Sequence, residues 1–207
     1  MRLALLAAAL LAAPVEKKVI DFESDEHMKP PKGFEFGRTG EGRPGQWVIM
    51  ARDDAPSGKM VLTQADDDPT DDRFPVAYTG PAMKDLRVSV RCMAVSGKVD
   101  QGCGVIFRVK DADNYYVARA NALEDNVRLY RVVKGSRRQF GGWNGKVASG
   151  KWHELAVEAK GDHFIVFFNG QKVIDEHDST FTEPGKFGVW TKADSGILFD
   201  DLTATPE

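Results

Sequence analysis

Alternation of apolar and polar residues is the feature that most limits what this chain can fold into. It is clearest in two runs, Tyr115–Asn121 and Asn126–Val133, which flank a short polar turn. Side chains of a β-strand point alternately to opposite faces, so such runs predict an antiparallel pair with one buried face. After the N-terminal segment, no stretch shows sustained apolar spacing with the helical period of about 3.6 residues.

The same rhythm of strand and turn recurs along the chain. Short strands are predicted at Val19–Ser24, Gln46–Met50 and Lys59–Thr63. Near the C-terminus, Asn169 and Gly170 separate two apolar runs, and this dipeptide favours the positive-φ turn of a β-hairpin. About a dozen short strands with polar turns are typical of two packed sheets. We therefore predict one all-β domain, a two-sheet antiparallel sandwich over residues 16–207.

Three segments are predicted as loops. The stretch from Pro30 to Gly45 is rich in proline and glycine. The segment 65–74 carries aspartates without the alternating pattern of a calcium-binding loop, which favours a solvated acidic loop. Trp143 lies in the glycine-rich segment 140–145, where no strand alternation explains it.

The N-terminus has the features of a secretory signal. Arg2 precedes an apolar run that ends at Ala13, and a helix that spans a membrane needs about 20 apolar residues. A positive start, a short apolar run and small residues at its end are typical of a signal peptide. We predict that residues 1 to about 15 are removed and that the protein is secreted or periplasmic, without a transmembrane segment.

Export would place Cys92 and Cys103 in an oxidising compartment. The segment around them predicts a hairpin that turns near Ser96–Asp100, with Cys92 opposite Cys103 and both in the inward phase of their strands. A cross-strand disulfide then has suitable geometry, and two buried free thiols fit the same pattern.

The net charge of the chain bears on whether nucleic acid could be its partner. The formal net charge is −3, which argues against nucleic acid as the main partner. The one basic cluster, Lys134 with Arg137 and Arg138, is short and follows a predicted strand, so a solvated hairpin end is the favoured interpretation.

Several motifs resemble one known family. They are DFES near the start, RFP in the middle, DADNYYVARANALEDNVRLY, W-x-x-L-x-V from Trp152, FNG, and GKFGVWTKADSGILFDDL. Together they resemble the 3-keto-disaccharide hydrolase domain family, over roughly Ile20 to Thr203. That family belongs to the concanavalin A-like lectin/glucanase superfamily, so the resemblance implies a jelly-roll sandwich and a sugar as ligand or substrate.

The polar turn between the two alternating runs carries the candidate chemistry. The chain lacks the Glu-x-Asp-x-x-Glu strand of retaining glucanases. A keto-sugar needs only one base and one electrophile for elimination, because its keto group acidifies the neighbouring C–H bond. Glu124 or Asp125 is the candidate base, with Arg119 or a metal as the electrophile. The alternative is a polar hairpin end whose side chains satisfy backbone groups.

Four further residues are candidates for sugar binding. Asn121 and Asn126 offer amides beside the same turn, and Tyr115 and Trp143 offer aromatic faces for stacking. Trp143 is either a ligand contact or a loop anchor.

No cofactor is required by this chemistry. The resemblance implies one candidate metal, because jelly rolls of this superfamily often tie the first and last strands together with a structural calcium ion. Asp21 or Glu23, together with Asp201, are the candidate ligands at the two ends of the domain, since carboxylate oxygens are the ligands that calcium takes. Exposed strand carboxylates are the alternative. The resulting hypothesis is an exported protein that hydrolyses or eliminates 3-keto-glycosides, with a non-catalytic lectin-like module as the second possibility.

Overall fold

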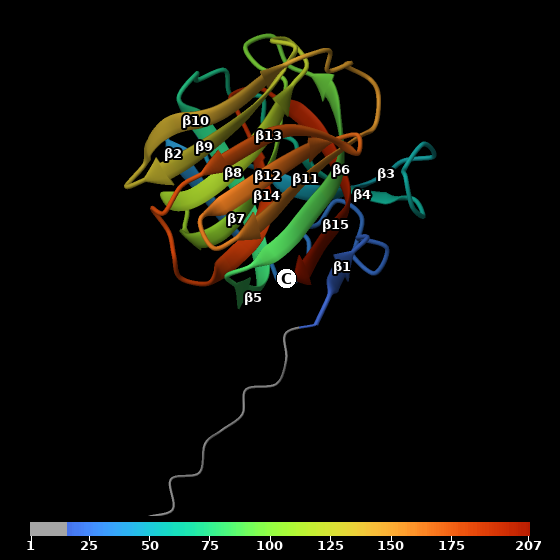
Figure 1. Cartoon of the computed structure of the whole chain (residues 1–207). Helices are drawn as coiled ribbons and strands as arrows, with labels where there is room; N and C mark the ends of the chain where they lie inside the picture. Colours follow the sequence, from blue (N-terminus) through green and yellow to red (C-terminus); the bar gives the residue numbers. More distant parts are fainter. Residues whose placement is uncertain (1–15) are drawn as a thin grey trace, which may run out of the picture.

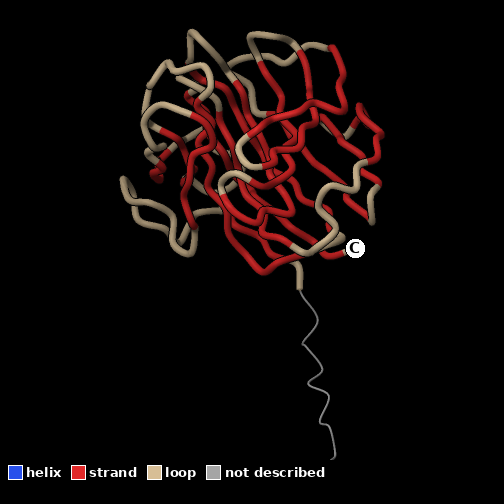
Figure 2. Tube along the Cα trace, turned by 90° about the vertical axis from the view of Figure 1, so that its left-hand side faces the viewer, coloured by secondary structure: helices blue, strands red, loops and turns tan. Residues whose placement is uncertain are grey.

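The computed structural model describes residues 16–207, and all regular structure in that range is β-strand (Figure 2). The predicted signal peptide lies outside the described residues. Two antiparallel sheets stack face to face (Figure 1). The prediction of a two-sheet antiparallel sandwich of the concanavalin A-like jelly-roll type is confirmed.

One sheet has eight strands. In spatial order they are β13 (Gln171–His177), β12 (His163–Phe168), β11 (His153–Lys160), β6 (Leu86–Ser96), β15 (Gly196–Pro206), β4 (Met60–Gln64) and β3 (Trp47–Ala51), with β1 (Lys18–Ile20) also paired to β15. Because β1 and β15 pair along Lys18–Ile20, the two ends of the domain lie side by side.

The other sheet has seven strands. Their order is β10 (Ser136–Asn144), β9 (Asn126–Val133), β8 (Asn114–Asn121), β7 (Gly102–Asp111), β14 (Gly185–Thr191), β5 (Arg73–Met83) and β2 (Glu35–Gly40). The predicted pairing of β8 with β9 is confirmed, with Asn121 opposite Asn126 and Arg119 opposite Arg128.

The core lies between the sheets and is built from the inward phase of each strand. Fully buried residues such as Val88, Val105, Tyr116 and Phe187 meet there. The outward phase of the seven-stranded sheet is also apolar near its centre, where Trp190 stacks on Phe74 with ring centres 5.6 Å apart.

Three strands were not expected from the sequence. β2 lies inside the segment that was predicted as a loop because of its glycines and prolines, and β5 begins in the acidic segment. The glycine-rich segment around Trp143 is the end of β10, an edge strand with a bulge between Gln139 and Gly141. Its two glycines remove strand propensity, but the ladder with β9 supplies the hydrogen bonds that hold it extended.

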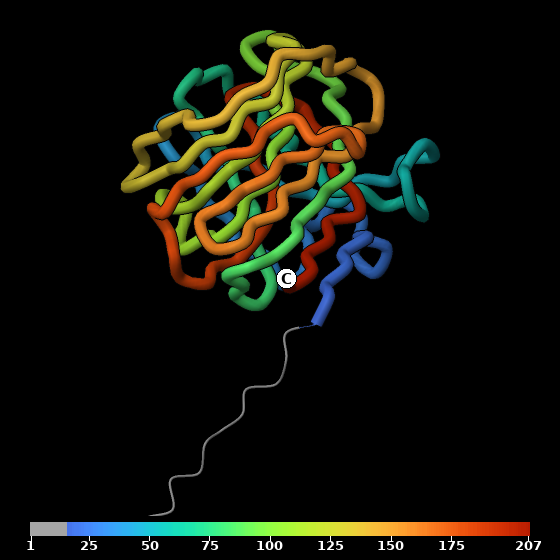
Figure 3. Tube along the Cα trace, viewed as in Figure 1, coloured from blue at the N-terminus to red at the C-terminus, as the bar shows by residue number. Residues whose placement is uncertain are grey.

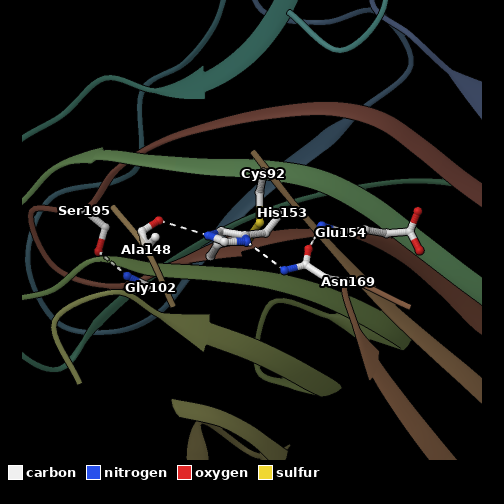
Figure 4. The surroundings of a disulfide bond; sticks show 8 residues. Cys92, Gly102, Ala148, His153, Glu154, Asn169 and Ser195 are labelled. Carbon is white, nitrogen blue, oxygen red and sulfur yellow. Dashed lines mark hydrogen bonds between the residues drawn. A yellow bond between two sulfur atoms is a disulfide. The ribbon is translucent and has the colours of Figure 1, made fainter. Parts of the chain in front are cut away.

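The hairpin predicted around the cysteines is wrong, although the cysteines do meet. Strand β6 belongs to the eight-stranded sheet and β7 to the seven-stranded sheet, so the chain crosses between sheets at residues 97–101. Cys92 and Cys103 form a disulfide across the core, with Cα atoms 6.5 Å apart. Figure 4 shows its surroundings, where the ring of His153 is held by the carbonyl oxygen of Ala148 and the side chain of Asn169.

Within residues 16–207, no helix is present that is long and apolar enough to cross a membrane.

Candidate functional site

The polar groups predicted around the β8–β9 turn form one hydrogen-bonded network. Arg119, which is 5% exposed, donates from Nη1 to Asn126 Oδ1 at 2.6 Å and from Nη2 to Glu124 Oε2 at 2.7 Å. Asn126 Nδ2 also donates to Glu124 Oε2 at 3.0 Å, and Arg119 Nη2 donates to the hydroxyl of Tyr130 at 3.2 Å. We call these four residues the Arg119 cluster. The β8–β9 register brings them together because Asn126 and Arg119 share the outward phase of adjacent strands.

Glu124 is a poor base in this setting. Burial raises the pKa of its carboxyl, but hydrogen bonds from Asn126 and Arg119 outweigh that effect, and the pKa lies below its ordinary value. A carboxylate that is stabilised in its charged form accepts a proton less readily. The cluster therefore presents Glu124 as a hydrogen-bond acceptor.

Asp125 lies away from this network. Its backbone has a φ of 51°, and its Oδ1 accepts the N–H of Val147 at 3.0 Å while Lys146 Nζ pairs with Oδ2 at 3.0 Å. The hydrogen bond from Val147 and the one from Lys146 lower the pKa of the Asp125 carboxyl. The side chain fixes the loop after β10 and is not positioned with Arg119 for joint chemistry.

The sequence analysis did not identify Asp100 and Lys192, which lie next to the Arg119 cluster. Asn121 Nδ2 donates to Asp100 Oδ1 at 2.9 Å, and Lys192 Nζ lies 3.2 Å from Asp100 Oδ2. Burial raises the pKa of Asp100, which is 3% exposed, even though the positive charges of Lys192 and Arg119 oppose this. No sequence signal points to this pair, because Asp100 and Lys192 meet only through the pairing of β7 with β14.

Tyr115 does not reach the surface. Its side chain is fully buried on the outward phase of β8, and its hydroxyl lies 2.8 Å from Thr39 Oγ1. The predicted stacking role is therefore wrong for Tyr115, because neighbouring aromatic side chains of the same sheet face cover it.

Trp143 lines an open pocket at the edge of the sandwich. The pocket has a volume of about 470 Å³ and lies where β10, the edge of one sheet, meets β13, the edge of the other. Its lining consists of Arg128, Gln139, Phe140, Gly141, Gly142, Trp143, Asn144 and Glu176. We call it the edge pocket. The half-buried Trp143 ring packs against Phe168, with ring centres 6.1 Å apart, and keeps part of its surface in the pocket.

Glycines give the edge pocket its shape. A Cβ atom at Gly141 would lie 2.7 Å from Ile174 and 3.0 Å from Glu176, so only glycine lets β10 and β13 approach so closely. A Cβ atom at Gly145 would lie 1.9 Å from the Trp143 ring, so this glycine leaves the space that the indole occupies.

Arg128 joins the edge pocket to the Arg119 cluster. It lies opposite Arg119 on the same sheet face, and its guanidinium donates to the carbonyl oxygen of Trp143 and to Asn144 Oδ1, both at 2.7 Å. Adjacent strands are about 4.8 Å apart, so Arg128 of β9 lies between the buried Arg119 of β8 and the exposed Asn144 of β10.

The acids predicted to hold calcium do not converge. Glu23 Oε1 accepts the backbone N–H of Lys59 at 2.8 Å, and Asp201 Oδ1 accepts the hydroxyl of Ser57 at 2.7 Å. Asp21 makes a local turn contact to the N–H of Glu23. In the described part of the chain, no group of three or more His, Cys, Asp or Glu side chains could hold a metal ion. These side chains do not fit a shell of about seven oxygens, and calcium stays a prediction without a formed site.

Solved structures share the fold. A carbohydrate-binding module from Bacillus subtilis superposes with a TM-score of 0.64 at 24% identity, covering 77% of this chain and 94% of the module. A glycosidic hydrolase superposes with a TM-score of 0.59 at 14% identity, covering 94% of this chain and 97% of the hydrolase.

Sequence comparisons give the family. A levanase from Bacillus subtilis (strain 168) is 34% identical over 96 residues, which cover 45% of this chain and only 14% of the levanase. The family model described as a 3-keto-alpha-glucoside-1,2-lyase-like domain matches residues 32–204, nearly the whole described domain. The family suggested by the motifs is thereby confirmed, and the chain belongs to the 3-keto-alpha-glucoside-1,2-lyase-like domain family.

Proposed function

We propose that the protein binds carbohydrate and that the edge pocket is its binding site. The observation that carries this proposal is the composition of the pocket. A half-buried tryptophan lies beside guanidinium, amide and carboxylate groups in an open space of about 470 Å³. A sugar ring has apolar C–H faces that stack on an indole and hydroxyls that exchange hydrogen bonds with such groups.

The pocket offers both donors and acceptors at its rim. Gln139 and Asn144 are exposed, so their amides can bind hydroxyls, and the half-buried Glu176 offers a carboxylate on the opposite side. Arg128 is held in place by its bonds to Trp143 and Asn144. Groups that are already held lose little conformational freedom when a ligand binds.

The state of the acids favours binding over catalysis. Glu124 and Asp125, the predicted bases, both have lowered pKa values and existing hydrogen-bond partners. The likeness to a carbohydrate-binding module and to part of a levanase supports the same proposal.

Calorimetric titration with a panel of glucans, fructans and 3-keto-glycosides tests this function. Trp143→Ala should lower affinity at least about tenfold, since removing a stacked aromatic side chain from a binding site commonly costs more than about 1 kcal/mol. The matched control is Phe36→Ala, because Phe36 is 43% exposed on β2 at the far edge of the same sheet. Equal affinity of Trp143→Ala and wild-type protein would refute the site.

A second candidate function is elimination from a 3-keto-glycoside between the Arg119 cluster and the neighbouring Asp100. Family membership and the raised pKa of Asp100 favour it. Asp100 would accept the proton from the carbon next to the keto group, and an N–H of Arg119 would stabilise the enolate oxygen. The enolate electrons would then form the carbon–carbon double bond as the glycosidic C–O bond breaks, and the leaving alkoxide would take up the proton that Asp100 had accepted.

Release of the leaving sugar from a 3-keto-glycoside tests this second function. Asp100→Asn should lower turnover by about a hundredfold or more, the lower end of general-base effects, while Glu124→Gln should change it less. Wild-type protein that binds the glycoside but never cleaves it, with or without added divalent metal, would leave binding as the function.

We also propose that the protein is exported to an oxidising compartment. The disulfide between Cys92 and Cys103 supports this, since such bonds persist mainly outside the cytosol. Mature protein from its native host should lack roughly the first 15 residues, and an intact Met1 detected by mass spectrometry would contradict export through this segment.

A further inference from the structure

We propose that a second pocket, at the turn end of the β9–β10 hairpin, binds the anionic substituent of an acidic glycan, a carboxylate or a sulfate. It would make acidic oligosaccharides the preferred ligand class. The inference rests on the proposed function and extends the edge pocket along the same strand.

The pocket is built by facing residues of the hairpin. It has a volume of about 300 Å³ and is lined by Arg131, Val133, Ser136 and Arg138. Arg131 pairs with Arg138, and Val133 with Ser136, in the β9–β10 register. Directly opposed residues have Cβ atoms about 5 Å apart, so the two guanidinium groups and the serine hydroxyl enclose one small space.

The charges in this pocket are unbalanced. Arg131 forms an ion pair with Asp178, whose carboxylate also accepts the hydroxyl of Tyr116 at 2.7 Å and the N–H of Thr180 at 2.8 Å. Burial raises the pKa of Asp178, but these hydrogen bonds outweigh it and keep the pKa below its ordinary value, so Asp178 stays charged.

Arg138 has no such counter-ion. It is exposed, and no carboxylate lies within 4.0 Å of it among residues 16–207. Two like charges held opposite each other on adjacent strands destabilise a sheet. An anion between them would relieve this repulsion and accept charge-assisted hydrogen bonds from both guanidinium groups.

The second pocket is open because the β9–β10 hairpin extends beyond β13, the strand of the other sheet that covers the base of the hairpin. Near the edge pocket, Ile174 of β13 packs over Gly141. Towards the turn between β9 and β10, β13 no longer covers the hairpin because it ends at His177. The side chain of Arg131 is therefore 32% exposed. In Figure 3 the tip of this hairpin projects at the left beyond the neighbouring strands.

The two pockets lie along one row of side chains. Arg138 and Trp143 both take the inward phase of β10, and five residues of strand span roughly 16 Å. A ligand longer than one sugar ring could therefore stack on Trp143 while an acidic substituent reaches Arg138. A neutral glycan would use the edge pocket alone.

Binding of three glycan classes to Arg138→Gln protein tests the inference. The probes are neutral glucan oligomers, oligogalacturonate and chondroitin sulfate oligomers. At least one acidic class should bind wild-type protein about tenfold more tightly than the neutral oligomers. Arg138→Gln should remove that difference, since the variant loses the charge-assisted hydrogen bonds to the anionic group. The two acidic arms show whether carboxylate or sulfate is preferred.

Arg91→Gln is the matched control, because it removes the same charge from β6 in the other sheet, where the side chain is 45% exposed. It should change affinity for every probe less than twofold. Equal losses in Arg138→Gln and Arg91→Gln would overturn the inference, as would acidic glycans that bind no more tightly than neutral ones. Loss of neutral binding in Trp143→Ala is a separate result: it tests the edge pocket, and Arg138-dependent binding of an acidic probe can persist without it.

Discussion

At the scale of single residues, the surroundings of Asp200 raise the pKa of its carboxyl enough to affect stability at mildly acidic pH. It is fully buried beside Asp201, and its carboxylate accepts the N–H of Ser57 at 3.0 Å and the N–H of Asp201 at 2.7 Å. Burial raises the pKa of Asp200 from an ordinary 3.8 to about 6, against the effect of these hydrogen bonds and with help from the charge of Asp201.

This pKa predicts that Asp200 makes the protein less stable as pH rises. Between about pH 4 and 6 the folded protein holds a proton that the unfolded chain releases, so the free energy of unfolding falls across this interval. Above about pH 6 this loss of unfolding free energy reaches its full size, at most about 3 kcal/mol. Urea unfolding of wild-type and Asp200→Asn protein at about pH 4, 5, 6 and 7 covers the interval over which the folded and unfolded states differ in protonation. The variant should gain stability relative to wild type as pH rises. A difference that does not change with pH would show that Asp200 titrates normally.

Residue types around the Arg119 cluster were predictable, but their protonation was not. The sequence gathers Arg119, Glu124 and Asn126 around one predicted turn, and the structure brings these three together. The raised pKa of Asp100 depends on burial by strands far away in sequence, and only the folded sheet supplies that burial.

At the scale of elements, the sequence predicts strands well where alternation and turn residues agree. Asn169 and Gly170 have φ values of 50° and 78° and connect β12 to β13 as predicted. The connection of β6 to β7 could not be predicted in the same way. A hairpin and a crossing between sheets give the same inward phase to Cys92 and Cys103, because in both cases the inward residues face one core.

The position of the disulfide between two sheets predicts a clear effect on stability. The bond closes a loop with a sequence separation of 11, and chain entropy for such a loop gives about 3 kcal/mol. The double variant Cys92→Ala with Cys103→Ala should lose at least this much free energy of unfolding. Reduction of the wild-type protein should lower its urea midpoint in the same direction, whereas reductant should not affect the double variant. An unchanged midpoint after verified reduction would contradict a stabilising role.

At the scale of the whole molecule, one core joins all elements that carry the candidate sites. Residues of both sheets, among them Phe107, Phe164 and Phe199, belong to a single buried cluster. The edge pocket depends on the contact between β10 and β13, so it exists only while the two sheets are packed together. This dependence explains why sequence alone could name Trp143 but could not place Glu176 beside it.

The single core predicts that protein starting at residue 16 unfolds in one cooperative transition. The ends support this expectation, because β1 pairs with β15 from Lys18 to Ile20 and closes the domain on itself. No sheet can separate from the other without exposing the apolar residues between them, and each buried side chain of this kind contributes about 1.5–3 kcal/mol. Near-ultraviolet and far-ultraviolet circular dichroism should therefore give coincident melting curves, and calorimetric and van't Hoff enthalpies should agree. The tryptophan signal, which includes Trp143, should change at the same temperature. An earlier separate transition in that signal would mean that the β9–β10 edge unfolds on its own, and the two pockets would then belong to a unit less stable than the core.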